Sequence, residues 1–354
     1  MSHFALVRAV AITALSLCLV VVVLGAYVRL NNAGLGCPDW PGCYGHLTPA
    51  AAAADPHALT AAPAGRALDV GKAWREMVHR YAAGTLGLLI VWLTAMAIAW
   101  RRERLLPVGF AGALLAVVVA QGMLGMLTVT WQLTPVIVTL HLLFGFSTLS
   151  LLWWLVLSPA RRDGAWATGS ALRLSARGLA TARRLAVLAL IVLGVQIALG
   201  GWTSSNYAAI ACPDLPTCQG SWWPAADFRS AYVLWSRLGI NYEGGRLDSA
   251  ARVAIHLAHR VGALAVSVAL LAAALAALRV AGGWVRQAGS AVLVLLLLQL
   301  TIGVSMVRSG FPLWLATAHN AGAALLLLAT LALNRSLRPA GAVALIPGSP
   351  AARL

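Results

Sequence analysis

Four histidines lie inside long apolar segments of this sequence: His79, His141, His259 and His319. An ionisable side chain within a membrane-spanning segment is costly, so such a residue is a functional-site candidate by default. A neutral imidazole is also a common metal ligand. Two imidazoles on facing helices of a bundle can hold a planar ligand with a metal at its centre. To hold such a ligand, the helices must place the histidines in facing pairs at the same depth in the membrane.

The composition indicates a polytopic membrane protein. Of the 354 residues, 60% are hydrophobic and only 10% are charged, which excludes an ordinary soluble domain. No A-x-A-like cleavage site follows the first apolar segment, so we expect it to be a helix and not a signal peptide. Each apolar segment is about 20 residues or longer, enough to cross roughly 30 Å of hydrocarbon. The eight predicted spans are 8–28, 77–100, 105–128, 135–157, 184–203, 253–278, 286–307 and 312–333.

The formal charge of +16 reports topology. Most arginines fall in connections on one side of the predicted spans, and the positive-inside rule makes that side cytoplasmic. The charge therefore does not indicate a nucleic-acid partner. We expect a multi-pass protein of the cell inner (plasma) membrane with both termini in the cytoplasm. The arginines concerned are Arg101, Arg102, Arg104, Arg161, Arg162, Arg173, Arg177, Arg183, Arg184, Arg279, Arg286, Arg335 and Arg338.

The chain contains an internal duplication. Two long loops on the outer side, 29–75 and 204–251, each hold a C-x5-C pair, and these pairs are 175 residues apart. His79 and His259 are 180 apart, and His141 and His319 are 178 apart, as are Gln121 and Gln299 in the third helix of each half. A repeat of four helices has parallel topology.

The predicted fold is therefore all-α, with eight transmembrane helices in two pseudo-symmetric four-helix bundles. Residues 1–157 form the N-terminal half and 183–335 the C-terminal half. The Arg-, Ala- and Gly-rich stretch 158–182 is the predicted cytoplasmic linker, and 336–354 a cytoplasmic tail. For the Ala/Pro-rich stretch 50–71 we predict no structure.

The depth of the histidines favours heme ligation. Each lies a few residues into a helix that enters from the outer side, which at 1.5 Å per residue puts all four on the order of 10 Å below the outer boundary. A small residue follows each at i+4, on the same helix face, and would clear space for a macrocycle. The alternative is that the histidines are interhelical hydrogen-bond partners at ordinary packing positions. Four matched depths favour heme. The small residues are Ala83, Gly145, Ala263 and Ala323.

Charged neighbours suggest further roles. Arg80 and Arg260 follow their histidines and are candidates to bind heme propionates bidentately, with snorkelling to the interface as the alternative. Glu76 lies at i−3 from His79, where the second half has His256. A carboxylate there can accept a proton or stabilise developing positive charge, so we place catalysis in the N-terminal half. A local ion pair of Glu76 with a neighbouring arginine is the alternative.

The outer-side cysteines form two C-x5-C pairs, Cys37 with Cys43 and Cys212 with Cys218. Disulfides persist on this side of the membrane, so we predict a bridge within each loop as a structural staple. Thiol exchange with an external redox partner is a functional alternative. The spacing and the oxidising side argue against a zinc site.

The sequence resembles the heme A synthase family. The resemblance rests on the run 34–41 (GLGCPDWP), the box 76–80 (EMVHR), the lone His141 and His319, and the duplication. It implies a heme b cofactor held by His259 and His319, and a heme O substrate held by His79 and His141. The implied reaction is oxidation of the C8 methyl of heme O to a formyl group, giving heme A for terminal oxidases. It also implies a heme O synthase and a membrane electron acceptor as partners, and allows a homo-oligomer.

Two other classes of function compete with this enzyme. A diheme electron-transfer cytochrome has no need of the difference between Glu76 and His256, and a transmembrane wire would place its hemes at opposite depths. A transporter built on an internal repeat would more often have helices broken near mid-membrane. Pro135 and Pro312 instead lie at the starts of their segments. These features favour the enzyme.

Overall fold

The computed structural model describes residues 2–55, 68–158, 176–235, 238–280 and 283–338. Within these ranges the chain is helical without strands, and eight helices are long and apolar enough to cross a membrane. The predicted class, an all-α membrane protein with eight membrane-spanning helices, is confirmed. The eight are α1 (His3–Leu30), α4 (Val70–Ala99), α5 (Val108–Thr130), α6 (Pro135–Leu157), α7 (Ala176–Ser205), α9 (Ser249–Val280), α10 (Gly283–Arg308) and α11 (Leu313–Ser336). Short helices α2 (Pro49–Ala54), η2 (Ala209–Ala211) and α8 (Phe228–Ala231) lie in the outer loops.

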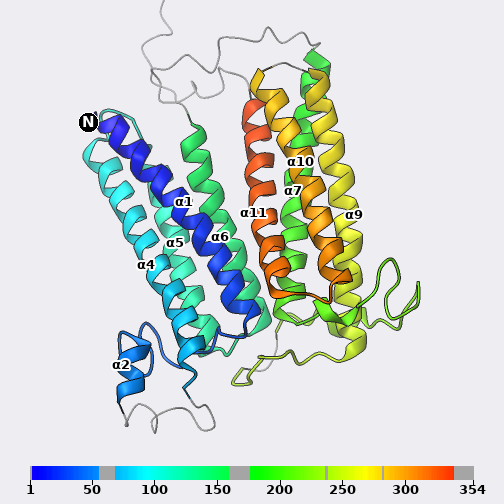
Figure 1. Cartoon of the computed structure of the whole chain (residues 1–354). Helices are drawn as coiled ribbons and strands as arrows, with labels where there is room; N and C mark the ends of the chain where they lie inside the picture. The colour runs from blue at the N-terminus through cyan, green and yellow to red at the C-terminus, as the bar shows by residue number, and fades with distance from the viewer. Residues whose placement is uncertain (1, 56–67, 159–175, 236–237, 281–282, 339–354) are drawn as a thin grey trace, which may run out of the picture.

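The long helices form two groups of four (Figure 1). In the first group α1 contacts α4, α4 contacts α5, α5 contacts α6, and α6 returns to α1. In the second group α7, α9, α10 and α11 make the same closed circuit. Helices α1 and α6 of the first group meet α11 and α7 of the second. This arrangement is consistent with the predicted pair of four-helix halves.

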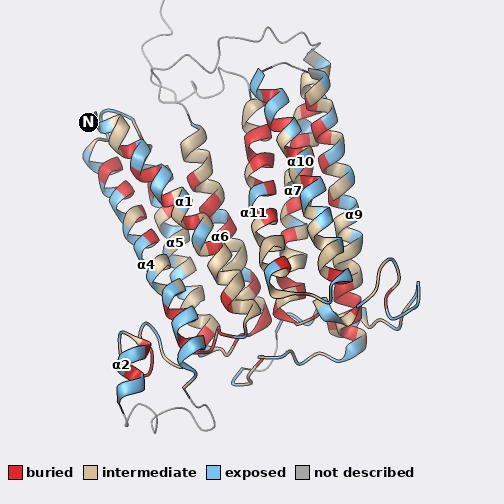
Figure 2. Ribbon diagram, in the orientation of Figure 1, coloured by how far each residue is buried: buried red, intermediate tan, exposed pale blue. Residues whose placement is uncertain are grey.

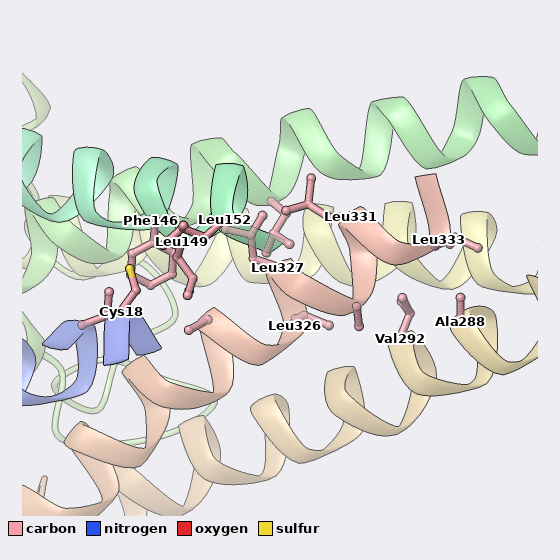
Figure 3. Packing of buried hydrophobic residues seen from close by; sticks show 14 of the residues in the cluster. Cys18, Phe146, Leu149, Leu152, Ala288, Val292, Leu326, Leu327, Leu331 and Leu333 are labelled. Carbon is pink, nitrogen blue, oxygen red and sulfur yellow. The ribbon is translucent and has the colours of Figure 1, made fainter. Parts of the chain in front are cut away.

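The core is apolar and continues across the junction between the groups. Figure 3 shows Cys18, Phe146 and Leu149 of the first group near Leu326 and Leu327 of the second. Exposed residues recur along the long helices (Figure 2), and many of them are large and apolar, such as Leu88 and Leu264, each at least 70% exposed. Apolar side chains exposed on this scale on the long helices suit contact with lipid.

The largest differences from the predicted helix boundaries are at the starts of α4 and α7. Helix α4 begins at Val70, well before the predicted 77, because Asp69 caps it by accepting a hydrogen bond from the Lys72 backbone N–H at 3.0 Å. Helix α7 begins at Ala176, inside the predicted linker. The stretch 50–71, for which no structure was predicted, begins inside helix α2 (Pro49–Ala54), which is capped by the Thr48 hydroxyl. Residues 56–67, 159–175 and 339–354 lie outside the described residues.

Equivalent ends of the two halves meet at the outer side. Arg29 at the end of α1 donates to the Ser204 carbonyl at 2.5 Å, and the Tyr207 hydroxyl donates to Asn32 Oδ1 at 2.9 Å. Each contact joins residues 175 apart, the spacing of the cysteine pairs. The ends of α1 and α7 therefore face each other as the two members of a repeat.

Candidate functional site

Each of the four histidines packs against a glycine of a neighbouring helix. They lie on α4, α6, α9 and α11, within roughly the first three turns from the outer end. A Cβ placed on the facing glycine would stand close to the imidazole Cε1 in every case, so a larger residue would push the ring away. The distances to Cε1 are 2.9 Å for Gly25 and His79, 3.2 Å for Gly125 and His141, 3.3 Å for Gly200 and His259, and 3.1 Å for Gly303 and His319.

The histidines are divided between the two helix groups. His79 lies on α4 and His141 on α6 of the first group, and His259 lies on α9 and His319 on α11 of the second. Each group thus contributes one pair of imidazoles near its outer end.

The ring nitrogens leave bonding capacity unused. The Nδ1 atoms of His79, His141 and His319 are buried without a hydrogen-bond partner. A buried polar atom in this state costs free energy, about 1–3 kcal/mol. A metal-ligating imidazole uses one nitrogen for the metal and the other for a hydrogen bond. The unused nitrogens of His79, His141 and His319 fit ligands to the iron of a heme, with at least one such nitrogen in each pair.

The sites are not ordinary protein metal cages. Among the described residues, no group of three or more His, Cys, Asp or Glu side chains could hold a metal ion. Two imidazoles per site therefore suit a metal that brings most of its own donor atoms, as the iron of a porphyrin does with its four nitrogens.

The predicted clearing beside His141 is occupied. Gln121 of α5 lies against Gly145, with its Nε2 3.3 Å from the place a Cβ would take. The small residue there makes room for this glutamine and not for a macrocycle. Sequence analysis also missed Gln196 of α7, whose Nε2 lies 3.1 Å from His259 Nδ1. The signal was the pattern Q-x3-G, which links Gln121 to Gly125 and Gln196 to Gly200.

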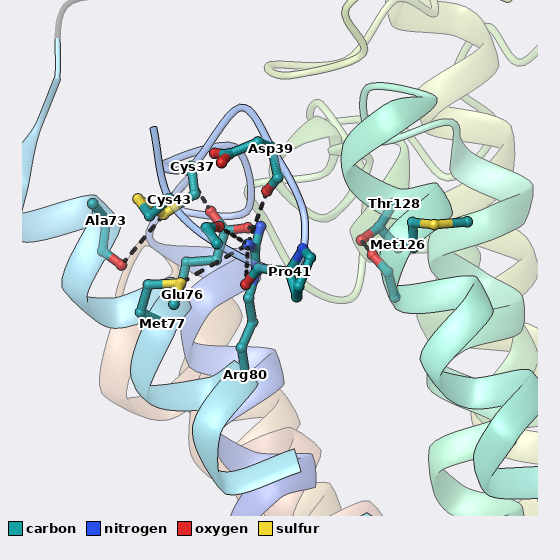
Figure 4. A network of polar contacts seen from close by, with 12 residues as sticks. Cys37, Asp39, Pro41, Cys43, Ala73, Glu76, Met77, Arg80, Met126 and Thr128 are labelled. Carbon is teal, nitrogen blue, oxygen red and sulfur yellow. Dashed lines mark hydrogen bonds and ion pairs between the residues drawn. A yellow bond between two sulfur atoms is a disulfide. The ribbon is translucent and has the colours of Figure 1, made fainter. Parts of the chain in front are cut away.

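Glu76 is buried and points at the first cysteine loop (Figure 4). The side chain belongs to a residue only 4% exposed. Its Oε2 accepts from the Cys37 backbone N–H at 2.9 Å, and its Oε1 accepts from Arg80 Nη2 at 2.5 Å. The equivalent His256 is also buried and lies edge-on to Phe311, with ring centroids 6.3 Å apart. The two halves therefore differ here in chemistry as well as in sequence.

Arg80 and Arg260 each bind a cysteine loop. Both guanidinium groups donate to backbone carbonyls, which gives the two side chains a role that sequence analysis did not anticipate. The propionate-binding role stays a prediction. Arg80 Nη1 donates to Asp39 at 2.9 Å, Pro41 at 3.3 Å and Gly42 at 2.5 Å; Arg260 donates to Cys212 at 3.1 Å, Asp214 at 2.8 Å and Thr217 at 2.8 Å.

Both cysteine pairs are disulfides in the structure. The Cα atoms of Cys37 and Cys43 are 4.7 Å apart, and those of Cys212 and Cys218 are 4.6 Å apart. Both distances lie within the range of a disulfide. With the sulfurs joined in this way, no thiolates remain in the two loops for a zinc site.

An aspartate organises each disulfide loop from within. Asp39 accepts from the Tyr44 and Gly45 backbone N–H groups at 2.6 and 2.8 Å. In the second loop Asp214 accepts from the Thr217 hydroxyl and from the Gln219 and Gly220 backbone N–H groups. The Thr217 hydrogen bond is the main cause that holds the pKa of Asp214 below its usual range, because it stabilises the carboxylate. The two loops therefore share one construction.

Eight membrane-spanning helices and two pairs of buried imidazoles define a membrane protein with two candidate heme sites. The chain belongs to the COX15-CtaA family, described as cytochrome oxidase assembly protein, whose model matches residues 8–331. The predicted family resemblance is thereby confirmed.

Curated relatives cover most of the chain. A protein of Shewanella oneidensis named "Heme A synthase" is 43% identical over 321 residues, 89% of this chain and 92% of the relative. One of Rhizorhabdus wittichii with the same name is 27% identical over 339 residues, 88% of each chain. A third, from Shouchella clausii and also so named, is 30% identical over 227 residues, 63% of this chain and 66% of the relative.

Proposed function

We propose that this protein is a heme A synthase, an oxidoreductase that converts the C8 methyl of heme O to a formyl group. The observation that carries the proposal is the difference between two otherwise matched histidine pairs. Both pairs lie against glycines, but only the first has a buried carboxylate one turn from a ligand position, at Glu76. The name shared by the relatives, heme A synthase, supports this choice of reaction.

The two pairs would hold different hemes. His79 and His141 would hold the heme O substrate, and His259 and His319 a heme b cofactor that remains bound. Iron in a tetrapyrrole supplies the one-electron chemistry that an oxidation of this kind needs. The protein contributes ligands, an apolar surrounding and a fixed carboxylate.

Glu76 would act on protons released as the methyl carbon is oxidised. Its carboxylate is oriented by the Cys37 N–H and the Arg80 guanidinium, so both oxygens have defined directions. Arg80 also offsets part of the free energy that burial costs the charged form of the carboxylate. A charged carboxylate can accept a proton and stabilise positive charge that develops nearby.

The test replaces Glu76 by glutamine in a host that makes heme O but no heme A. The wild-type protein should produce heme A, with a hydroxymethyl intermediate detectable by mass spectrometry. The Glu76→Gln variant keeps the shape and the bond to Cys37 but loses the charge. It should retain heme b and stop making the formyl product or stall at the intermediate. Unaltered heme O in the presence of folded, heme-loaded wild-type protein would contradict the enzyme and favour a diheme electron carrier.

The cellular setting follows from the same assignment. We infer that the protein lies in the inner (plasma) membrane with both termini in the cytoplasm, because arginine-rich connections occupy the side of the helix ends opposite the disulfide loops. Heme O synthase and a membrane electron acceptor are the expected partners, and a homo-oligomer is compatible with the fold. The N-terminal half 1–157 would hold substrate and the C-terminal half 183–335 the cofactor.

A further inference from the structure

One turn before each histidine-facing glycine stands a residue that is the same in one pair of equivalent positions of the two halves and different in the other. These residues are Val21, Gln121, Gln196 and Gln299, each four positions before its glycine and so on the same helix face. All four helices thus present a glycine and the residue at i−4 toward an imidazole. Three of the four residues are glutamine, and the exception is the one that serves His79.

In the C-terminal half, a glutamine side chain touches each imidazole. Gln196 Nε2 lies 3.1 Å from His259 Nδ1 and donates to the His259 carbonyl at 3.0 Å. Gln299 Nε2 lies 3.3 Å from His319 Nε2 and donates to the His319 carbonyl at 3.0 Å. Each amide is thereby fixed to the main chain of the histidine whose ring it touches.

Two further glycines make these contacts possible. Gly262 and Gly322 each stand three residues after a histidine, and a Cβ on either would collide with the Oε1 of the facing glutamine. Glutamine and glycine therefore form a matched pair in each of the two contacts. This matching indicates that the contacts are built into the C-terminal half.

Among the described residues of the N-terminal half, no side chain holds an imidazole in this way. The Nδ1 atoms of His79 and His141 are buried without a hydrogen-bond partner. Val21 has no polar side chain to offer His79, and the side chain of Gln121 lies against Gly145 with its own Oε1 buried and unpartnered. The rings of this half therefore lack the double attachment present in the other.

We propose that Gln196 and Gln299 are positioning residues that fix the C-terminal imidazoles as permanent heme ligands, while the N-terminal pair is left free to exchange its heme. This assignment of cofactor and substrate to the halves rests on the proposed function. The Oε1 atoms of both glutamines are buried and unpartnered. A metal-bound imidazole carries a proton on its other nitrogen and needs an acceptor for it. A half-turn of the amide presents Oε1 to that proton and breaks the Nε2 donation to the histidine carbonyl, so the bond to the ring replaces the bond to the main chain when heme is bound.

The experiment measures heme retention in purified full-length protein. Gln196→Met and Gln299→Met preserve side-chain length and remove the hydrogen bonds. Loss of such a partner typically weakens metal binding 10–100-fold, so transfer of heme b to excess apomyoglobin should be at least about 10-fold faster. The midpoint potential should rise and the low-spin electron paramagnetic resonance signal should shift, since the ligands become less basic. The matched control, Gln121→Met, should leave heme b retention, potential and signal unchanged.

The reciprocal variant, Val21→Gln combined with Ala82→Gly, supplies the missing amide beside His79 together with the clearance that Gly262 and Gly322 give in the other half. It should slow the loss of heme from the N-terminal half about 10-fold or more. If either methionine variant fails to fold, this variant still tests whether the amide fixes the heme. Unchanged retention, potential and spectrum in both folded methionine variants would overturn the proposal, as would unchanged retention in the folded reciprocal variant. None of these readouts requires heme A formation. A protein that retains heme b through the glutamines but leaves heme O unaltered would overturn the proposed function alone.

Discussion

At the scale of single residues, four glycines position the histidines because they have no side chain. Gly25, Gly125, Gly200 and Gly303 each give an imidazole its place on a neighbouring helix. The space for a larger residue is smallest at Gly25, where an added Cβ would lie 2.9 Å from His79 Cε1. Non-bonded carbon atoms prefer a separation of about 3.5–4.0 Å. One methyl group would therefore displace the ring or separate α1 from α4.

The Gly25→Ala variant should lose heme from the N-terminal half and keep heme b in the C-terminal half. The added methyl moves His79, whereas His259 and His319 lie in the other helix group. Heme content per protein, measured as the pyridine hemochrome with mass analysis, would fall toward the value for one site. The control is Gly87→Ala on α4, where a Cβ meets nothing within 4 Å. Equal heme content in both variants would refute the role of Gly25.

The residue scale also separates what the sequence could and could not predict. The histidines, Glu76 and the cysteines were visible because their types are unusual in apolar segments or outer loops. The facing glycines and Gln196 were not, since a contact between helices depends on how each is rotated toward its neighbour. The contacts of Arg80 were equally hidden. Its charge suggested a role in binding a heme propionate, but its guanidinium donates to the Asp39 and Gly42 carbonyls, which lie far from it in the sequence.

At the scale of elements, the outer end of α4 is joined to the first disulfide loop through a buried ion pair. Glu76 and Arg80 lie one turn apart on α4, and both side chains reach the loop. The second half has only the arginine contacts, because His256 replaces the acid. The pair Arg80 and Arg260 therefore offers a matched comparison of the same clamp with and without a buried carboxylate.

The Arg80→Met variant should be destabilised more than Arg260→Met. Removal of Arg80 leaves Glu76 buried without its cation, and breaking one partner of a buried pair costs about 3–5 kcal/mol. Removal of Arg260 loses hydrogen bonds to carbonyls, each worth about 0.5–1.5 kcal/mol net. Thermal unfolding in detergent would measure both. Adding Glu76→Gln should restore part of the stability lost in Arg80→Met. Equal losses in the two arginine variants would show that the carboxylate is not part of the clamp.

Element boundaries followed hydropathy only where the helices cross the membrane. The span 135–157 was predicted at both ends, because Pro135 starts the helix and the apolar run is continuous. Helix α4 extends further than predicted because Lys72, Arg75 and Glu76 lower the local hydropathy without breaking the helix. Its start is set by the Asp69 cap, a local signal that a hydropathy pattern does not contain.

At the scale of the whole molecule, the two halves are joined by an apolar junction and a polar contact at its outer end. The second outer loop also reaches back to the first half: the Tyr242 N–H donates to the Gln132 carbonyl at 3.0 Å, and Glu243 lies 3.8 Å from Lys72. At the same end, the Arg29 guanidinium stacks on the Tyr207 ring at 4.0 Å while donating to Ser204. The Arg29 contacts lie one turn from Gly25, which faces His79, and from Gly200, which faces His259. Their geometry depends on how the halves are held together.

The Arg29→Met variant should loosen the outer ends of α1 and α7 without disrupting either half. A hydrogen bond from a charged donor is worth about 1.5–3 kcal/mol, and a desolvated cation–π contact adds about 2 kcal/mol. We therefore expect a lower unfolding temperature and a broader distance distribution between spin labels placed on the two disulfide loops. Arg308→Met, at an exposed position at the end of α10, is the control. Narrow, unchanged distances in Arg29→Met would mean that the apolar junction, with the Tyr242 and Glu243 contacts, fixes the outer ends of the halves without Arg29.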